Sequence, residues 1–202
     1  MSKIDKPIAQ FQKRMFDLVL GTVLIVVTLP IQILIAVLIV VTAFQNPIFV
    51  QIRAGKYNQP FYCIKFRTMR GKMKNAGENE QYRITKIGKW LRLIGLDELP
   101  QLWNVLYGTM SLVGPRPTFL YQTAKYTPYQ FQRLKVKPGI TGLAQIKGRN
   151  RLSWQERIEY DIEYIQKWSL WLDVWILLQT PFAMLRWKDA YGKEGKNDNF
   201  EV

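Results

Sequence analysis

Residues 15–44 read MFDLVLGTVLIVVTLPIQILIAVLIVVTAF, an almost unbroken run of apolar side chains. Asp17 and Gln32 interrupt this run, and Pro30 lies at its centre. Because about 20 apolar residues are enough for a helix to cross the hydrocarbon core of a bilayer, the run predicts a membrane segment. A secretory signal peptide is the competing interpretation, but its apolar region is shorter and ends at a small-residue cleavage site. We therefore expect residues 1–46 to form an N-terminal membrane unit.

Pro30 and the charges on both flanks indicate how this segment meets the bilayer. Proline breaks the hydrogen-bond ladder of a helix and favours a bend. Cations precede the segment and are frequent again from Arg53 to Lys74, and loops rich in Lys and Arg stay on the cytoplasmic side of a membrane. Both ends are therefore predicted to lie on one face, as a re-entrant helical hairpin with its membrane break at Pro30. A proline-kinked helix that spans the bilayer is the alternative.

The rest of the chain reads as one basic domain on the membrane surface, expected over residues 47–190. Alternating apolar and polar side chains predict a small β-hairpin, with strands near 48–53 and 60–67. Helical periodicity predicts helices near 85–95, 98–107, 118–134 and 153–167. A mobile polar loop is expected at 71–81 and a disordered tail at 191–202. The predicted fold class is helix-rich α+β, in a monotopic membrane protein with interfacial amphipathic helices.

A second membrane signal lies at residues 168–187, which read WSLWLDVWILLQTPFAMLRW. Asp173, Gln179 and Pro181 argue against a helix that spans the bilayer. We expect an amphipathic helix in the headgroup region, where Trp is enriched. A stripe that faces the protein core is the alternative. The large apolar side chains that recur at helical spacing are Trp168, Trp171, Trp175, Leu178, Phe182 and Leu185.

Composition excludes several classes of catalyst. The chain of 202 residues has no His, which rules out Ser-His-Asp and Cys-His triads and His-ligated zinc proteases. Cys63 is the only cysteine and cannot form an intrachain disulfide or a thiolate zinc site. Lys and Arg number 29 against 15 Asp and Glu, a net charge of +14. Catalysis must therefore use carboxylates, Lys, Tyr or a bound metal, and the expected partners are anionic: phosphates, lipid headgroups or nucleic acid.

Asp97 and Glu98 are the only adjacent acidic pair in the chain, and apolar Leu96 and Leu99 flank them. Pro100 follows at a position typical of the first turn of a helix, where a helix N-terminus can lower the pKa of one carboxylate. Asp97 could instead simply cap that helix by accepting hydrogen bonds from its backbone N–H groups. The local sequence leaves both interpretations open.

Further along the chain, cations lie next to Gly and Pro in a pattern suited to phosphate. Pro115 and Pro117 hold Arg116 between two rigid residues, so its guanidinium loses little entropy when it binds a phosphate. Glycines beside the cations of 135–142 and 147–151 let the backbone approach a phosphate closely. Other phosphate candidates, each of which could equally be a solvated surface residue, are Lys65, Arg67, Arg92 and Arg149.

The order of these elements resembles that of the bacterial sugar transferases, the small monotopic phosphoglycosyl transferases that act on polyprenol phosphate. The resemblance covers nearly the whole chain. The stretches that match are 14–17 before the proline-broken segment, 51–55, 65–69, 87–92, 96–102, 104–106, 110–117, 137–142, 144–145 and 148–150. One departure lies at the break, where members often carry Ser-Pro and this chain has Leu29-Pro30. Thr28 is expected to supply the hydroxyl that bonds a freed helix carbonyl.

The resemblance implies a specific reaction. It is the transfer of a phospho-sugar from a nucleotide diphosphate sugar, usually a UDP-sugar, to a polyprenol phosphate such as undecaprenyl phosphate, with UMP as the second product. Asp97 would be the nucleophile, would carry the phospho-sugar covalently and would contact Mg²⁺. Glu98 would act as base or orienting group for the acceptor, and Arg116 between Pro115 and Pro117 would bind the nucleotide end. The product would start the assembly of a polysaccharide or other membrane glycoconjugate.

The resemblance also implies a location, the cytoplasmic face of the inner (cytoplasmic) membrane, with membrane lipids as partners and homo-oligomer formation left open. Two other functions fit the sequence in part. A membrane-anchored basic module could bind anionic lipid or nucleic acid without catalysis, but no nucleic-acid motif is present and we expect no nucleic-acid partner. A soluble nucleotide-sugar glycosyltransferase is disfavoured because the chain lacks an Asp-x-Asp motif. The nearest approach, Asp161-Ile-Glu163, is expected on the solvated face of a helix.

Overall fold

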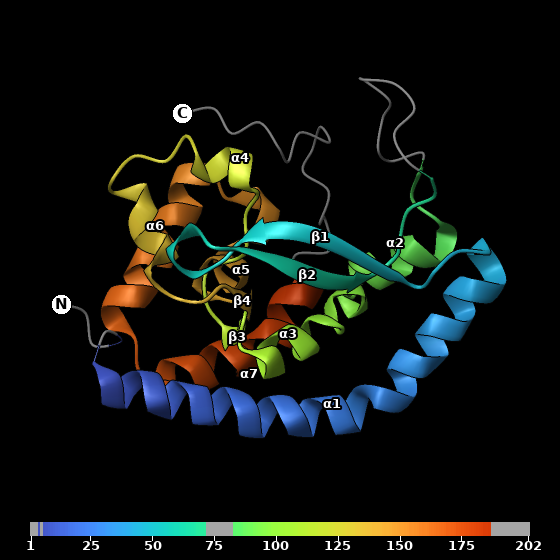
Figure 1. Ribbon diagram of the computed structural model, residues 1–202, viewed down its shortest axis with the longest axis horizontal. Helices are drawn as coiled ribbons and strands as arrows, with labels where there is room; N and C mark the ends of the chain where they lie inside the picture. The colour runs from blue at the N-terminus through green and yellow to red at the C-terminus, as the bar shows by residue number, and fades with distance from the viewer. Residues whose placement is uncertain (1–3, 5, 72–82, 187–202) are drawn as a thin grey trace.

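The computed structural model describes residues 4, 6–71 and 83–186 (Figure 1). The predicted polar loop, from residue 72 onward, and the predicted tail at 191–202 lie outside the described residues. The described chain combines a long N-terminal helix, six further α-helices and two small two-stranded sheets. The predicted helix-rich α+β class is therefore confirmed.

The α-helices are α1 (Pro7–Ala43), α2 (Lys86–Leu93), α3 (Gln101–Tyr107), α4 (Leu120–Thr123), α5 (Leu143–Lys147), α6 (Trp154–Lys167) and α7 (Leu170–Arg186). Short 3-10 turns are η2 (Lys56–Asn58), η4 (Leu96–Glu98), η5 (Gln130–Lys135) and η6 (Arg149–Arg151). The antiparallel hairpin consists of β1 (Ile48–Ala54) and β2 (Pro60–Phe66), with Gln51 opposite Cys63. A parallel pair joins β3 (Ser111–Val113) to β4 (Gly139–Thr141).

The hairpin and the helices predicted near 85–95, 98–107 and 153–167 form close to their expected bounds. The single helix predicted over 118–134 is wrong, because the chain forms only α4 and η5 there. Pro128 lies between them, and proline disfavours a helical conformation in the residue before it. Thr127 exchanges side-chain and backbone hydrogen bonds with Gln130, which offers the backbone an alternative to a helix.

α1 is the one helix in the described part of the chain that is long and apolar enough to cross a membrane. It runs along the bottom of the molecule in Figure 1 and then bends upward over its C-terminal part. Pro30 lies inside the helix and cannot donate to the carbonyl oxygen of Val26. Thr28 donates its hydroxyl to the carbonyl oxygen of Leu24 at 2.6 Å, and Gln32 donates to Thr28 at 2.9 Å. The expectation that Thr28 bonds the carbonyl freed by Pro30 is therefore wrong, because its acceptor is Leu24 and not Val26. Such back-bonding itself helps to bend a helix.

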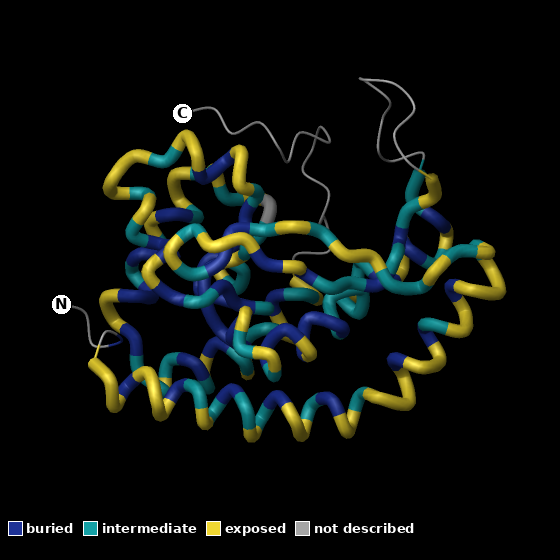
Figure 2. The backbone as a smooth tube through the Cα atoms, viewed as in Figure 1, coloured by how far each residue is buried: buried dark blue, intermediate teal, exposed yellow. Residues whose placement is uncertain are grey.

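α1 is apolar on every side, but only one side of it is buried along its length. Figure 2 shows the buried positions recurring at regular intervals along the helix. The outward side is left uncovered by the protein: Phe11 is 66% and Val27 is 69% exposed. A helix with an uncovered apolar side of this length is suited to contact lipid. The inward residues are Ala9, Lys13, Asp17, Gly21, Ile25, Gln32, Ile35 and Ile39.

A buried ion pair attaches the N-terminal half of α1 to the body. Lys13 Nζ lies 2.7 Å from a carboxylate oxygen of Asp173 in α7, and Asp173 is completely buried. The Tyr164 hydroxyl donates to the same carboxylate at 2.7 Å, and the Trp168 indole donates to it at 3.2 Å. A buried charge needs both a counter-ion and hydrogen bonds, and Asp173 has both.

Further contacts hold both halves of α1 to the same body. Arg14 donates to two carbonyl oxygens in the last turn of α3, and Asp17 accepts from the hydroxyl and the backbone amide of two successive residues of β3. Beyond the bend, Ile35 and Ile39 are buried in an apolar cluster with side chains from β2 and α2. The bent helix therefore follows the body on both sides of Pro30.

α7 confirms that a helix forms near the C-terminus with large apolar side chains on its exposed side, whereas its expected place in the headgroup region stays a prediction. Its inward side packs on the core, whereas Trp171 is 77% and Phe182 is 66% exposed. Trp168 was expected on the outward stripe, and that expectation is wrong because only 4% of it is exposed. It precedes the first residue of α7 and turns inward, where its indole hydrogen-bonds Asp173.

Removing one partner of the Lys13–Asp173 pair is expected to cost about 3 kcal/mol of unfolding free energy, because the other charge stays buried and unpaired. Lys13→Met and Asp173→Asn should each lower the Tm of the detergent-solubilised protein by about 6 °C or more. The double variant should lose less than the sum of the two. Lys167→Met, which breaks the exposed pair with Glu163, is the matched control and should shift the Tm by less than about 2 °C. Strictly additive losses would show that Lys13 and Asp173 do not interact.

Candidate active site

The acidic pair lies on η4, a single turn between α2 and α3. Gly95 enters this turn with φ of 69°, a left-handed conformation that glycine adopts without strain. Asp97 and Glu98 follow, and both are partly buried. The N-cap of α3 is Pro100, and no side-chain hydrogen bond caps that helix. The interpretation of Asp97 as a mere helix cap is therefore wrong.

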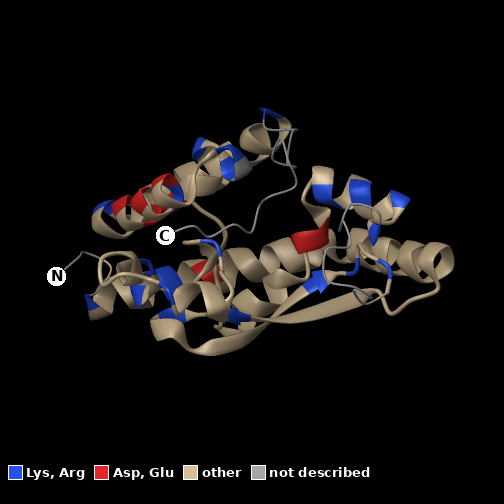
Figure 3. Cartoon of the chain, turned by 90° about the horizontal axis from the view of Figure 1, so that it is seen from above, with Lys and Arg blue, Asp and Glu red and all other residues tan. Residues whose placement is uncertain are grey.

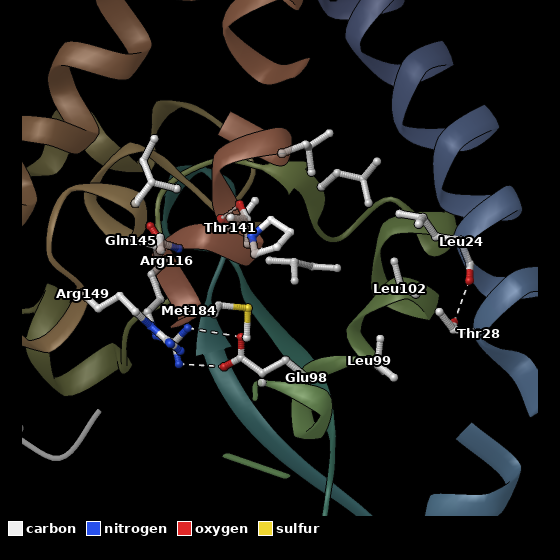
Figure 4. A pocket seen from close by; sticks show the side chains of 18 residues that line it. Leu24, Thr28, Glu98, Leu99, Leu102, Arg116, Thr141, Gln145, Arg149 and Met184 are labelled. Carbon is white, nitrogen blue, oxygen red and sulfur yellow. Dashed lines mark hydrogen bonds and ion pairs between the residues drawn. The ribbon is translucent and has the colours of Figure 1, made fainter. Parts of the chain in front are cut away.

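Two cations hold the Glu98 carboxylate. Lys65 Nζ on β2 lies 2.9 Å from one of its oxygens, and Arg116 Nη2, beyond the end of β3, lies 2.7 Å from the same oxygen. A second N–H of Arg116 donates to the other oxygen at 3.3 Å, so the contact is bidentate (Figure 4). Because a bidentate contact fixes both the position and the plane of a guanidinium, Arg116 is held in place before any ligand binds.

Asp97 is the carboxylate left without compensation. Within the described residues its side chain makes no hydrogen bond or ion pair. Burial raises its pKa, and the negative charge of Glu98 raises it further, against the opposing charges of Lys65, Arg92 and Arg116. Burial also acts to raise the pKa of Glu98, but Arg116 and Lys65 outweigh it and hold that pKa far below its usual range. Glu98 is thus a carboxylate paired with cations, whereas the carboxylate of Asp97 has no such partner and is available for chemistry.

A mainly apolar cavity opens beside Glu98 and Arg116, and we call it the apolar cavity (Figure 4). Figure 4 shows Leu24 and Thr28 of α1 at the side away from Arg149. These two residues immediately precede the bend at Pro30, so the cavity extends from the acidic pair to the bend of the apolar helix. Other apolar side chains in its wall are Leu99, Leu102, Ile140, Leu177 and Met184.

A second, more polar pocket adjoins the first, and we call it the polar pocket. Arg116, Gln145 and Arg149 line both spaces. Phe119 and Trp154 supply aromatic surface in the polar pocket, and the guanidinium of Arg53 lies 3.5 Å from the centre of the Phe119 ring. Other residues in its lining are Pro117, Thr118, Gln122, Arg133, Arg157 and Asp161.

Buried polar atoms without partners lie where the two spaces meet. Arg149 Nη1 and both polar side-chain atoms of Gln145 are buried and form no hydrogen bond within the described structure. Burial, together with the charge of Arg116, lowers the pKa of Arg149, so an anion would be favoured there. Buried polar groups are costly unless a ligand or ordered water satisfies them. The junction therefore has the chemistry of a site for an anionic, hydrogen-bonding ligand.

The other predicted site residues occupy different places. Pro117 lines the polar pocket, whereas Pro115 is buried and its carbonyl oxygen accepts from the amide of Gly139. Arg92 donates to the Thr68 hydroxyl at 2.7 Å and reaches Asp97 through its charge. Arg67 lines neither space. It donates to two backbone carbonyl oxygens at the start of the hairpin, and its predicted phosphate contact stays a prediction.

The ion pair between Arg133 and Asp161 was missed by the sequence reasoning. Both side chains are only 2% exposed, so the expectation that Asp161 lies on a solvated face is wrong. On α6 it shares the inward side with Ile158, Ile162 and Ile165. That spacing is the signature of one helix face and could have predicted the burial of Asp161. The pair supports the floor of the polar pocket.

The described residues contain no complete metal site, because no three potential metal ligands gather among them. In Figure 3 the red segments of Asp and Glu lie in a few separate places on the ribbon, among many blue segments of Lys and Arg. Mg²⁺ is usually held by one or two carboxylates together with substrate phosphates. Asp97, which has no protein partner in the described structure, fits the role of such a ligand, whereas Glu98 is already engaged.

Comparison with known proteins gives a consistent result. The profile of the family described as bacterial sugar transferase matches residues 8–187. An uncharacterized sugar transferase, EpsL, of Bacillus subtilis (strain 168) is 44% identical over 176 residues, which cover 86% of this chain and 87% of that protein.

Two longer relatives carry more specific names. The UDP-glucose:undecaprenyl-phosphate glucose-1-phosphate transferase of Klebsiella pneumoniae is 41% identical over 192 residues, or 89% of this chain and 41% of that protein. The UDP-galactose-lipid carrier transferase of Erwinia amylovora is 37% identical over 209 residues, or 94% of this chain and 44% of that protein. This chain thus spans less than half the length of these two relatives. Their names favour an enzyme over a non-enzymatic basic module.

The opposite environments of the two carboxylates predict opposite effects on stability. Asp97 has a raised pKa in the folded protein, so at neutral pH its ionised form opposes folding, and Asp97→Asn should raise the Tm. Glu98 has a lowered pKa, so its ionised form stabilises the fold at neutral pH, and Glu98→Gln should lower the Tm. We expect shifts of about 2–4 °C for each kcal/mol, measured by thermal unfolding at pH 7. A fall in Tm with both isosteric variants would contradict the assignment of Asp97 as the uncompensated charge.

Proposed function

This chain belongs to the bacterial sugar transferase family, and from that premise we propose that it transfers a sugar phosphate from a UDP-sugar to a polyprenol phosphate. By their names, the Klebsiella pneumoniae relative acts on UDP-glucose and undecaprenyl phosphate, and the Erwinia amylovora relative acts on UDP-galactose and a lipid carrier. The observation that carries the proposal is the acidic pair itself. The Asp97 carboxylate has no partner in the described structure and lies within the influence of the charges of Lys65, Arg92 and Arg116, and the neighbouring Glu98 lines the cavity that leads to the apolar helix α1.

In the proposed reaction Asp97 is the nucleophile. Its carboxylate oxygen attacks the sugar-proximal phosphorus of the donor, a new oxygen–phosphorus bond forms, and the bond from that phosphorus to the bridging oxygen breaks, so UMP leaves. A phosphate oxygen of the acceptor then attacks the same phosphorus, and the Asp97 carboxylate is released. The products are a polyprenol diphosphate sugar and the regenerated enzyme.

The surrounding residues have separate tasks in this scheme. Arg116 and Arg149 bind the diphosphate, and Arg92 adds positive charge. Glu98 keeps Lys65 and Arg116 in position and orients the acceptor phosphate. A divalent cation such as Mg²⁺ would be held by Asp97 and the donor phosphates, and it would neutralise negative charge on the diphosphate.

The two adjoining spaces suit the two substrates. The polar pocket offers Phe119 and Trp154 for contact with a nucleobase, and Gln145 for hydrogen bonds. The apolar cavity reaches from Glu98 to Leu24 on the membrane helix, so it suits the first isoprene units of the acceptor. Donor and acceptor would therefore approach the acidic pair from opposite sides.

We further propose that α1 is re-entrant and that the protein sits on the cytoplasmic face of the cytoplasmic membrane. Support comes from the bend at Pro30 and from the burial of the inward residues on both sides of it. The exposed apolar side chains of α7 would rest in the headgroup region. This placement brings the acidic pair close to the plane in which the acceptor phosphate resides.

Activity is predicted to require Asp97, the proposed nucleophile, but not an acid outside the acidic pair. Purified protein with Mg²⁺, a polyprenol phosphate and a panel of UDP-sugars should release UMP with at least one donor. Without acceptor, release should stop near one UMP per chain, because the phospho-sugar stays on Asp97. Asp97→Asn should lower turnover at least about 10³-fold. Glu163→Gln, the same chemical change at an exposed residue of α6, is the matched control and should stay within about twofold of the parent. Folded protein that releases no UMP with any donor would contradict the proposal.

The re-entrant arrangement predicts that both flanks of α1 are labelled from the same side. Single cysteines at Lys6 and Gln59, both exposed, would be introduced into a Cys63→Ser background. An impermeant maleimide should react with both only after the cytoplasmic side is made accessible, in inverted vesicles. Labelling of the two cysteines from opposite sides would show that α1 spans the membrane.

A further inference from the structure

A third pocket lies at the N-terminal half of α1, and we call it the basic pocket. It shares no lining residue with the apolar cavity or the polar pocket. Its walls come from α1, from η2 at the tip of the hairpin, and from the segment between η5 and β4. The cations in its lining are Lys13, Arg14, Lys56, Lys135 and Lys137, and its single acid is Asp17.

The acid in the basic pocket offsets only part of its positive charge, because Asp17 lies 4.0 Å from Lys13 Nζ. One carboxylate oxygen of Asp17 accepts two hydrogen bonds from β3, one from a hydroxyl and one from a backbone amide, both at 3.0 Å. Lys13 is paired with buried Asp173, and Arg14 is fixed by two carbonyl oxygens of α3. Three lysines therefore remain as an excess of positive charge in one concave space.

Lys137 is the most informative of these lysines. It is only partly exposed, and within the described structure its ammonium forms no hydrogen bond or ion pair. A Cβ added at Gly108 would lie 3.4 Å from Lys137 Nζ and 3.3 Å from Arg14 Nη2, so the two cationic groups approach the same spot. Burial lowers the pKa of Lys137, and the charges of Arg14, Lys56 and Lys13 lower it further, against the opposing charge of Asp17. An anion bound between these groups would remove that penalty.

The position of the basic pocket indicates where its anion comes from. Phe11 lines the pocket and is 66% exposed, and the next residues outward on α1 are exposed Ile8 and Met15. An apolar rim beside a cluster of cations matches a phospholipid, which presents acyl chains directly below a phosphodiester. A free phosphate ion would gain nothing from this rim.

We propose that the basic pocket binds the phosphodiester headgroup of an anionic phospholipid. Lys137, Lys56 and Lys135 would hold the phosphodiester, with Arg14 also in the pocket lining. The bound lipid anchors the N-terminal half of α1 to the body at headgroup depth. It occupies a site separate from the acidic pair, so its binding does not depend on the transferase reaction.

The test measures the Tm of the full chain in dodecyl maltoside micelles doped with increasing phosphatidylglycerol. We expect phosphatidylglycerol to raise the Tm with a saturable midpoint, and phosphatidylcholine to have no comparable effect. Lys137→Gln removes the ammonium group and should raise the midpoint at least about tenfold, since a charged hydrogen-bond donor is lost. Lys56→Gln on the opposite wall should act in the same direction. Lys89→Gln, an exposed lysine of α2, is the matched control and should leave the midpoint within about twofold.

Several outcomes would overturn the proposal. One is an equal response to phosphatidylcholine, and another is a midpoint that Lys137→Gln and Lys56→Gln leave unchanged. If inorganic phosphate or glycerol 3-phosphate raised the Tm with the same midpoint concentration as phosphatidylglycerol, the pocket would be assigned to a free phosphate instead of a lipid. UMP release is measured on the same samples, so a loss of lipid response with turnover retained separates this site from the acidic pair.

Discussion

The attachment of α1 to the body is the constraint on which the rest of the structure depends. A long helix that is apolar on all sides does not specify which side packs against the body. Lys13, Arg14 and Asp17 supply that preference, because each has a partner in the body that could not be satisfied by lipid. The polar side is thereby fixed inward, and the apolar side is left for the membrane.

The acidic pair shows the opposite use of buried charge. At Lys13 the fold compensates a charge fully, whereas at Asp97 it leaves one uncompensated next to Glu98. The cost is confined to a single turn. In the proposed reaction, a divalent cation that arrives with the donor phosphates would supply the positive charge that Asp97 lacks.

Much of this could be predicted from sequence because the signals were local. The bend of α1, the hairpin and the adjacent acids each follow from neighbouring residues, although α1 bends as one continuous helix and does not break at Pro30. What failed depended on contacts between distant segments. Trp168 turns inward because Asp173 needs a donor, and Arg133 is buried because α6 presents Asp161 to it. A pattern of single residues shows a charge but not its partner, so the polar pocket could not be assembled from sequence alone.

The proposed lipid site and the proposed acceptor site share one wall, α1, and their spacing decides whether they can interfere. On α1 the nearest lining residues of the two spaces are Asp17 of the basic pocket and Leu24 of the apolar cavity. Seven residues of helix separate them, or about 10 Å. A single phosphate cannot bridge that distance, so an anionic phospholipid and a polyprenol phosphate would bind side by side without competing. The lipid would then set how firmly α1 is held to the body, and the bend at Pro30 would set where the acceptor enters. Different parts of one helix can therefore serve attachment and acceptor entry.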